Sequence, residues 1–156
     1  MAQYKFSLIY ILSIVLVNIG FVYVPLIPLF DTMYPPMTIA VGLIFILRDY
    51  AQKEIGHKVL GAMLIGGLLS YVMADPYIAV ASLVAFMVSE TVDWGVYTLT
   101  DKPLRQRILL SSLISTPIDS GLFLYMIGQF SLTATLVMFV SKMLGALAVW
   151  HWLAKK

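Results

Sequence analysis

The chain has 156 residues, of which 61% are hydrophobic and only 12% are charged. A soluble domain has about a quarter charged residues, so this composition cannot cover a water-facing surface and predicts an integral membrane protein. The net charge is only +2, and there are no cysteines, which excludes a disulfide framework and a thiolate metal site.

Six stretches are long and apolar enough to span a membrane as helices, which takes roughly 20 mostly apolar residues. The sequence therefore predicts a single all-α membrane domain over residues 1–156, with helices at 6–24, 37–55, 59–74, 77–98, 107–128 and 131–152. The first stretch is not followed by a small-residue cleavage site, so we expect a retained helix rather than a signal peptide. Four prolines between residues 25 and 36 predict a stiff connection that serves either as a lid or as a plain connector.

Basic residues outside the membrane-deep positions occur only near the chain ends and the second and fourth connections. They are Lys5, Lys53, Lys58, Lys102, Arg105, Arg107, Lys155 and Lys156. The positive-inside rule then predicts that both termini and these two connections are cytoplasmic. We expect a multi-pass protein of the cell (inner) membrane.

The predicted fifth and sixth helices carry ionisable side chains near the middle of the membrane. Such groups are costly there and by default mark a substrate or ion pathway. Asp119 shares one helical face with Ser111, Ser115 and Phe123, because these residues recur every four positions. The serines alone would also fit simple helix packing. Lys142 is too deep to reach the surface and needs an anion, which either Asp119 or Glu90 could supply.

The predicted fourth helix places Glu90 and Asp93 on one face, with Trp94 beside them. Two carboxylates one turn apart repel each other if both are ionised. This arrangement fits either proton or cation coupling or a salt bridge to Arg48, and an inner pair of Arg48 with Asp93 is the candidate. Asn18 is the only amide in the first helix, and it contacts either a substrate or a neighbouring helix.

No pattern in the sequence supports an enzyme. There is no phosphate-binding glycine loop and no nucleophile and base at a known spacing, and His57 and His151 lack metal-ligand spacing. We therefore expect no catalytic residues, no cofactor, no metal and no nucleic-acid partner.

Several motifs together resemble the queuosine-precursor transporter family. They are residues 45–56 with Arg48 and Asp49, residues 89–93, residues 111–123, Lys142, and Asn18 where the family also has an asparagine. The resemblance implies a six-helix fold similar to the substrate-binding subunits of energy-coupling-factor vitamin transporters. It also implies uptake of a 7-deazaguanine, either the 7-cyano form, the 7-aminomethyl form or queuine. The functional set that it implies is Asp49, Glu90, Asp93, Asp119 and Lys142.

The chemistry of a 7-deazaguanine fits these residues. Its ring N–H and exocyclic amine can be accepted together by a carboxylate, for which Glu90 and Asp119 are the candidates. Its carbonyl oxygen needs a donor such as Lys142 or Asn18. An aromatic side chain would stack on the flat ring. The predicted substrate-binding residues, with Phe45 and Trp94 as the aromatic candidates, are Asn18, Phe45, Asp49, Glu90, Asp93, Trp94, Ser115, Asp119 and Lys142.

Two alternatives remain open at this point. The chain could be a substrate-binding subunit that docks on a separate energising complex through Gly61, Gly66 and Gly67, or it could form a homodimer. It could also be a structural membrane protein whose buried charges only pair with one another. The expected partners of a transporter are a purine-like small molecule and the lipid bilayer.

Overall fold

The computed structural model describes residues 4–73 and 76–153. Its elements in chain order are α1 (Lys5–Tyr23), β1 (Ile27–Leu29), β2 (Thr32–Tyr34), α2 (Thr38–Ile55), the 3₁₀ turn η2 (Gly56–Lys58), α3 (Val59–Met73), α4 (Pro76–Leu99), α5 (Leu104–Met126) and α6 (Leu132–Leu153). Each predicted helix has a counterpart, and their boundaries differ by no more than three residues. The predicted end of the third helix at residue 74, and Lys155 and Lys156, lie outside the described residues.

Within the described residues, four helical stretches are long and apolar enough to cross a membrane. They are Lys5–Tyr23, Thr38–Val72, Leu104–Met126 and Leu132–Trp152. Many large apolar side chains on the outside of the bundle are exposed, among them Leu8 and Leu12 on α1 and Leu64 and Leu68 on α3. This surface suits lipid rather than water, so the structure indicates a helical membrane protein.

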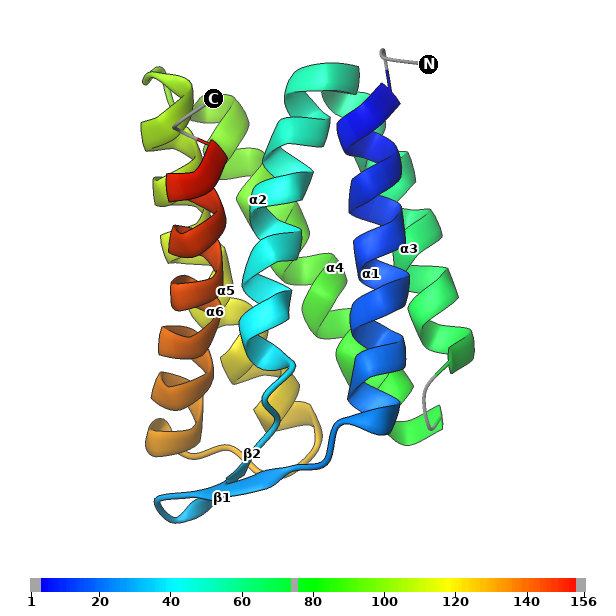
Figure 1. Cartoon of the computed structure of the whole chain (residues 1–156), viewed down its shortest axis with the longest axis vertical. Helices are drawn as coiled ribbons and strands as arrows, with labels where there is room; N and C mark the ends of the chain where they lie inside the picture. Colours follow the sequence, from blue (N-terminus) through cyan, green and yellow to red (C-terminus); the bar gives the residue numbers. More distant parts are fainter. Residues whose placement is uncertain (1–3, 74–75, 154–156) are drawn as a thin grey trace.

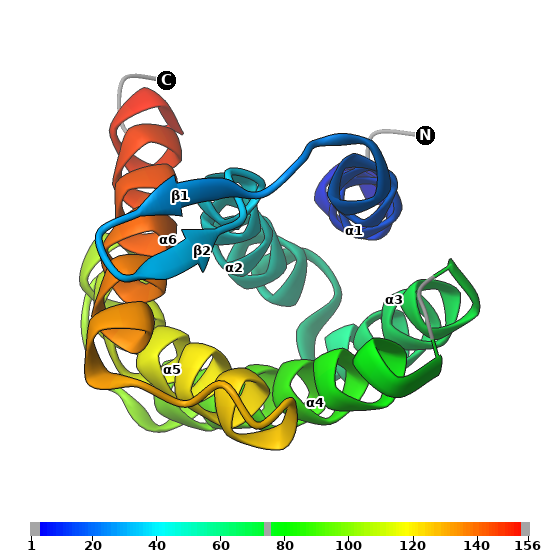
Figure 2. The ribbon, with the colours of Figure 1, turned by 90° about the horizontal axis from the view of Figure 1, so that it is seen from below.

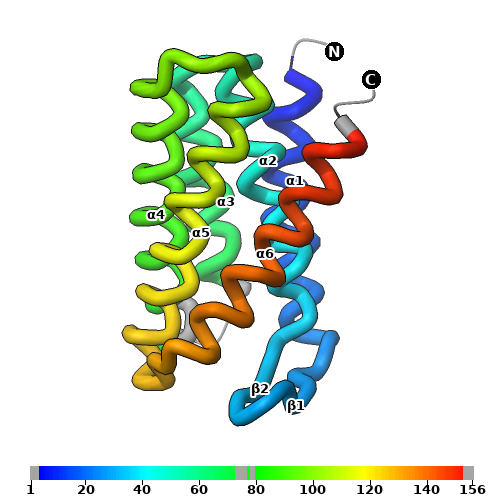
Figure 3. Tube along the Cα trace, turned by 90° about the vertical axis from the view of Figure 1, so that its left-hand side faces the viewer, coloured from blue at the N-terminus to red at the C-terminus, as the bar shows by residue number. Residues whose placement is uncertain are grey.

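The helices form a bundle with α2 on the inside. Figure 1 shows that the start of α1 and the end of α6 lie at one end of the bundle, which we call the terminal end, and that the β1–β2 hairpin lies at the other, the hairpin end. Seen from the hairpin end, α1, α3, α4, α5 and α6 follow one another in an arc around α2 (Figure 2). In the side view of Figure 3, α4 and α5 run next to each other over their length.

Two glycines let α2 and α6 approach closely. A Cβ atom on Gly42 of α2 would collide with the carbonyl oxygen of Lys142, and one on Gly145 of α6 would collide with the carbonyl oxygen of Ile39. Small residues commonly allow such close contacts between membrane helices. This reciprocal contact fixes the backbone of α6 at Lys142 against α2.

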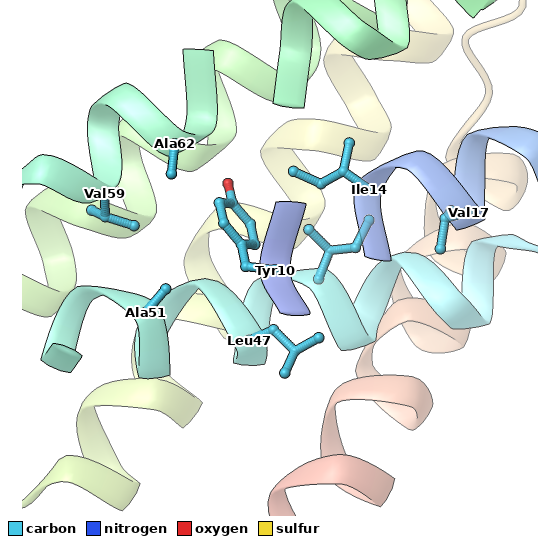
Figure 4. Close-up of a cluster of buried hydrophobic side chains, with 8 residues drawn as sticks. Tyr10, Ile14, Val17, Leu47, Ala51, Val59 and Ala62 are labelled. Atoms are coloured by element: carbon cyan, nitrogen blue, oxygen red, sulfur yellow. The ribbon is translucent and has the colours of Figure 1, made fainter. Parts of the chain in front are cut away.

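The packing of α1, α2 and α3 surrounds Tyr10 with small and medium-sized side chains. Figure 4 shows the cluster that joins the three helices, which contains Tyr10, Ile14, Val17, Leu47, Ala51, Val59 and Ala62. Gly66 of α3 packs against Ile14, and a Cβ on Gly67 would lie 2.9 Å from Leu83 of α4. Two of the three glycines proposed for docking therefore serve contacts within the chain, and only Gly61 faces open space.

The start of α1 is tied to the end of α2 by one carboxylate. Glu54 accepts hydrogen bonds from the backbone N–H groups of Phe6 at 3.1 Å and Ser7 at 2.8 Å, and from the Ser7 hydroxyl at 2.7 Å. The first N–H groups of a helix have no partner within the helix. Glu54 supplies that partner and holds α1 against α2 at the terminal end.

The proline-rich connection is an antiparallel hairpin, which the sequence analysis did not predict. Ile27 lies opposite Tyr34 and Leu29 opposite Thr32, and the turn contains Phe30 with a positive φ of 56°. Pro28 is tolerated in β1 because a two-stranded sheet consists of edge strands only. The hairpin lies across its end of the bundle, where β2 contacts α6.

Candidate functional site

A cavity of about 490 Å³ lies in the half of the bundle nearest the hairpin. All six α-helices and β2 contribute to its wall, which is mainly apolar and includes the aromatic rings of Phe86 and Phe123. Small-molecule sites typically measure about 300–1,000 Å³ and combine apolar walls with a few polar groups. The polar residues of this wall are Asn18, Thr32, Tyr34, Thr38, Ser70, Ser82, Asp119, Gln129 and Lys142.

Among the described residues of this wall, Asp119 and Lys142 are the only charged ones. Lys142 Nζ donates to Asp119 Oδ2 and, at 2.9 Å, to Ser120 Oγ. The other Asp119 oxygen accepts a hydrogen bond from Ser89 Oγ at 3.1 Å. The Lys142 side chain is 3% exposed and the Asp119 side chain 13% exposed, so the carboxylate is the more accessible member of the pair.

Local features of α5 and α6 position the pair. Pro117 lies inside α5 two residues before Asp119 and removes one backbone hydrogen bond of the helix there. On α6, the Gly42 and Gly145 contacts hold the Lys142 backbone against α2. The ammonium group therefore extends toward α5, where it meets the carboxylate.

Asn18 contributes an amide to the cavity wall and also links two helices. Its Nδ2 donates to the Ile14 carbonyl at 2.8 Å and to Ser70 Oγ at 2.5 Å. The interhelical hydrogen bond between α1 and α3 is thus present, and the residue faces the cavity as well.

A second polar cluster lies nearer the terminal end and is centred on Arg48. We call Tyr10, Arg48, Asp49, Glu90 and Asp93 the Arg48 network. Arg48 Nη1 lies 2.5 Å from Asp49 Oδ1 and 3.0 Å from Asp93 Oδ2, and Nε lies 3.3 Å from Glu90 Oε2. Its Nη2 donates to the Glu90 carbonyl at 2.9 Å. Arg48 is 1% exposed and the three carboxyl groups 0%, so Arg48 does not reach the membrane surface.

Hydroxyl groups from α1 and α5 complete the Arg48 network. Tyr10 donates to Glu90 Oε2 at 2.9 Å, Ser111 to Asp49 Oδ2 at 3.0 Å and Ser115 to Asp93 Oδ1 at 3.2 Å. The network therefore connects α1, α2, α4 and α5, and it lies between the cavity and the terminal end.

The predicted substrate-binding residues divide between these two places. Asn18, Asp119 and Lys142 line the cavity. Asp49, Glu90, Asp93 and Ser115 lie in or against the Arg48 network. Neither predicted stacking residue is in the cavity wall: Phe45 is 2% exposed within the helix packing, and Trp94 donates its indole N–H to His57 Nδ1 at 3.1 Å.

The sequence analysis did not single out Ser70, Ser82, Gln129 or Tyr10. Tyr10 had a detectable signal, because it is spaced helically with the other inward-facing residues of α1, Ser13, Ile14 and Val17. Phe86 and Phe123 lie one turn from Glu90 and Asp119 on the predicted faces, so they were the better stacking candidates. Single serines on apolar helices carry no comparable signal.

Two further observations limit the chemistry of the site. The described residues include no group of three or more histidine, aspartate or glutamate side chains arranged to hold a metal ion. A second hollow, of about 430 Å³ between α1, α2 and α6, has an almost wholly apolar wall, and Lys5 is the only charged residue among its described lining residues. The Asp119–Lys142 cavity is therefore the candidate site for a polar ligand.

Comparison with protein-family models, with curated proteins and with solved structures finds no match for this chain.

Proposed function

We propose that this chain is a membrane transporter whose six helices all cross the bilayer, with both termini in the cytoplasm. The orientation rests on the basic residues at the terminal end. Lys58 and Lys102 lie in connections there, and Arg105 and Arg107 lie in the first turn of α5, which begins there. The hairpin end then faces the outside, and the membrane is the cell (inner) membrane. The cavity would be reached from the outside.

The proposed substrate is a queuosine precursor, a 7-deazaguanine such as the 7-cyano form, the 7-aminomethyl form or queuine. Its identity rests on the resemblance of the sequence motifs to the queuosine-precursor transporter family. The observation that carries the proposal is the Asp119–Lys142 pair in the wall of a cavity of about 490 Å³. A buried ion pair contributes little to net stability compared with apolar packing, so its place beside a cavity favours a role in binding.

The geometry suggests how the ligand is held. The accessible Asp119 carboxylate would accept the ring N–H and the exocyclic amine, a bidentate arrangement that is both strong and directional. Lys142, next to it, would donate to the ring carbonyl. Phe86 and Phe123, rather than Phe45 and Trp94, are the aromatic side chains able to pack on the flat ring. Glu90 is left out of this contact because its carboxyl group is engaged with Arg48 and Tyr10.

The same geometry supports a transport cycle. The Asp119–Lys142 cavity lies on the hairpin side, and the buried Arg48 network lies between it and the terminal end. We propose that this arrangement is the outward-facing state and that the network is the inner gate. Import would require the helices joined by Arg48 to separate once the cavity is occupied.

The test uses purified full-length protein reconstituted into liposomes, with labelled 7-cyano-7-deazaguanine as the probe. We expect uptake by the unaltered chain and by Asp101→Asn, which changes an exposed carboxylate outside the cavity. Asp119→Asn and Lys142→Ala should lose uptake. If none of the three deazaguanines binds or enters, the proposal fails and a structural membrane protein becomes the better interpretation. Uptake only after addition of an energising complex would identify a binding subunit instead.

A further inference from the structure

The Arg48 network has more acidic groups than its basic group can balance. Arg48 faces the carboxyl groups of Asp49, Glu90 and Asp93. With all four groups ionised, one positive and three negative charges leave a net charge of −2. None of the three carboxyl groups is exposed to solvent, so water cannot stabilise the excess charge. An ionised carboxylate in such surroundings takes up a proton rather than remaining charged.

Among the described residues, no cationic side chain other than Arg48 forms an ion pair with these three carboxyl groups. The other titratable groups around the network are Tyr10 on α1, Tyr50 on α2, Tyr97 on α4 and Asp119 on α5, and none of them is cationic. Arg107 on α5 lies over the ring of Tyr97, 5.6 Å from its centre, and forms no ion pair with the three carboxyl groups. Lys142 on α6 donates to Asp119 and Ser120 and therefore pairs with the cavity carboxylate, not with the network. Ser89 lies on the other side of Asp119 and donates to its second oxygen. The acidic side chains among the described residues also do not converge into a group that could hold a metal ion.

The hydrogen bonds show where protons are missing. Arg48 Nη1 has two hydrogens but three acceptors around it: Asp49 Oδ1 at 2.5 Å, Gln52 Oε1 at 2.9 Å and Asp93 Oδ2 at 3.0 Å. Arg48 Nη1 and Asp93 Oδ2 are close enough to form an ion pair, but their geometry is not that of a hydrogen bond. Within the described part of the chain, Asp93 Oδ2 and Glu90 Oε1 are the two buried carboxyl oxygens that have no hydrogen-bond partner.

These two counts agree, since two excess negative charges correspond to two carboxyl oxygens without a donor. We infer that the Arg48 network is a proton-binding site that holds two protons on its three carboxyl groups when the terminal end is closed. Two bound protons make the network electrically neutral.

The position of the network suggests that these protons are coupled to transport, an inference that rests on the proposed function. Ser89 joins α4 to Asp119 in the cavity wall, and Ser115 joins α5 to Asp93 in the network. A ligand that takes over the Asp119 carboxylate therefore alters the α4–α5 contact that also holds the network. Opening of the terminal end would expose the carboxyl groups of the network to cytoplasmic water, into which the two protons are released.

The proton site is tested first by infrared spectroscopy of the purified protein at neutral pH. We expect a carbonyl band from protonated carboxyl groups, reduced by about half in Glu90→Gln and in Asp93→Asn and unchanged in Asp101→Asn. The unaltered protein serves as the decisive sample if a variant does not fold. Absence of a protonated carboxyl band in it, or a band that neither variant reduces, overturns the assignment.

The coupling is tested in liposomes with 7-cyano-7-deazaguanine and an internal pH dye. Counterflow of the labelled compound without a pH gradient measures the proposed transport alone. We expect an acidic exterior to increase net uptake several-fold and uptake to acidify the interior, and we expect Asp101→Asn to behave in the same way. Counterflow without any proton movement overturns the coupling and leaves the transporter intact. Absence of counterflow rejects the transporter and the coupling together, and the infrared result still decides the proton site.

Discussion

Lys142 on α6 and Asp119 on α5 neutralise each other in the wall of the cavity, and the carboxylate is the member more exposed to it. The pair could have either of two roles that the sequence left open, a structural role or a role in ligand binding. A purely structural pair is needed only for folding, whereas a binding pair is needed for the ligand even when the fold is stable.

Single and double substitutions of this pair distinguish the two roles. Asp119→Asn or Lys142→Met alone leaves one buried charge without a partner, which typically costs about 3–5 kcal/mol. We expect a clear fall in the thermal unfolding temperature in detergent and a loss of uptake. The double variant removes both charges, so its stability should return to near that of the unaltered protein, but uptake should remain absent. Transport by the double variant would show that the pair is only structural.

The close contact of α2 and α6 predicts a strong effect of adding a single methyl group. Gly42→Ala and Gly145→Ala each drive a Cβ atom into a backbone carbonyl of the facing helix, and such overpacking costs about 1–3 kcal/mol. Because α6 carries Lys142, we also expect weaker ligand binding. Thermal unfolding and ligand titration measure the two effects.

Gly61→Ala is the matched control, because a Cβ there meets no atom within 4 Å. Its stability should be unchanged or higher, since alanine is favoured over glycine in a helix by about 0.5–1 kcal/mol. Equal losses in all three variants would contradict the proposed close contact.

The sequence predicts the helices of this fold well for a physical reason. Apolar runs of spanning length are separated by prolines and short polar connections, and these local signals determine where each helix begins and ends. The hairpin was missed because its strands have three residues each and contain or adjoin prolines, which normally argue against strands.

The candidate site was predictable in its residue types but not in its grouping. Helical spacing placed Glu90 and Asp93 on one face and Asp119 on another, and both faces point inward. Helical spacing could not show that Arg48 points inward and pairs with three carboxyl groups, or that Lys142 pairs with Asp119 instead. That choice depends on which helices are neighbours and on their depth relative to one another, and single-helix periodicity contains neither.

Glu54 provides a prediction about the terminal end. Glu54→Ala removes the acceptor for two backbone N–H groups and one hydroxyl at the start of α1. Loss of a helix-capping acceptor costs about 0.5–2 kcal/mol, and we expect faster amide hydrogen exchange confined to the first turn of α1. Asp101→Asn is the control, because its side chain is exposed in a connection. Unchanged exchange at Phe6 and Ser7 would contradict the role of Glu54.

The proposed orientation is tested by two matched substitutions of exposed aspartates at opposite ends of the bundle. The chain has no cysteine, so the unaltered protein is the blank for thiol labelling. Asp31→Cys lies in the hairpin turn and Asp101→Cys in the connection between α4 and α5. If the hairpin end faces outward, a membrane-impermeant maleimide should label Asp31→Cys in intact cells and label Asp101→Cys only after lysis. The reverse pattern would invert the proposed orientation, and labelling of both positions in intact cells would contradict the odd number of spans between them.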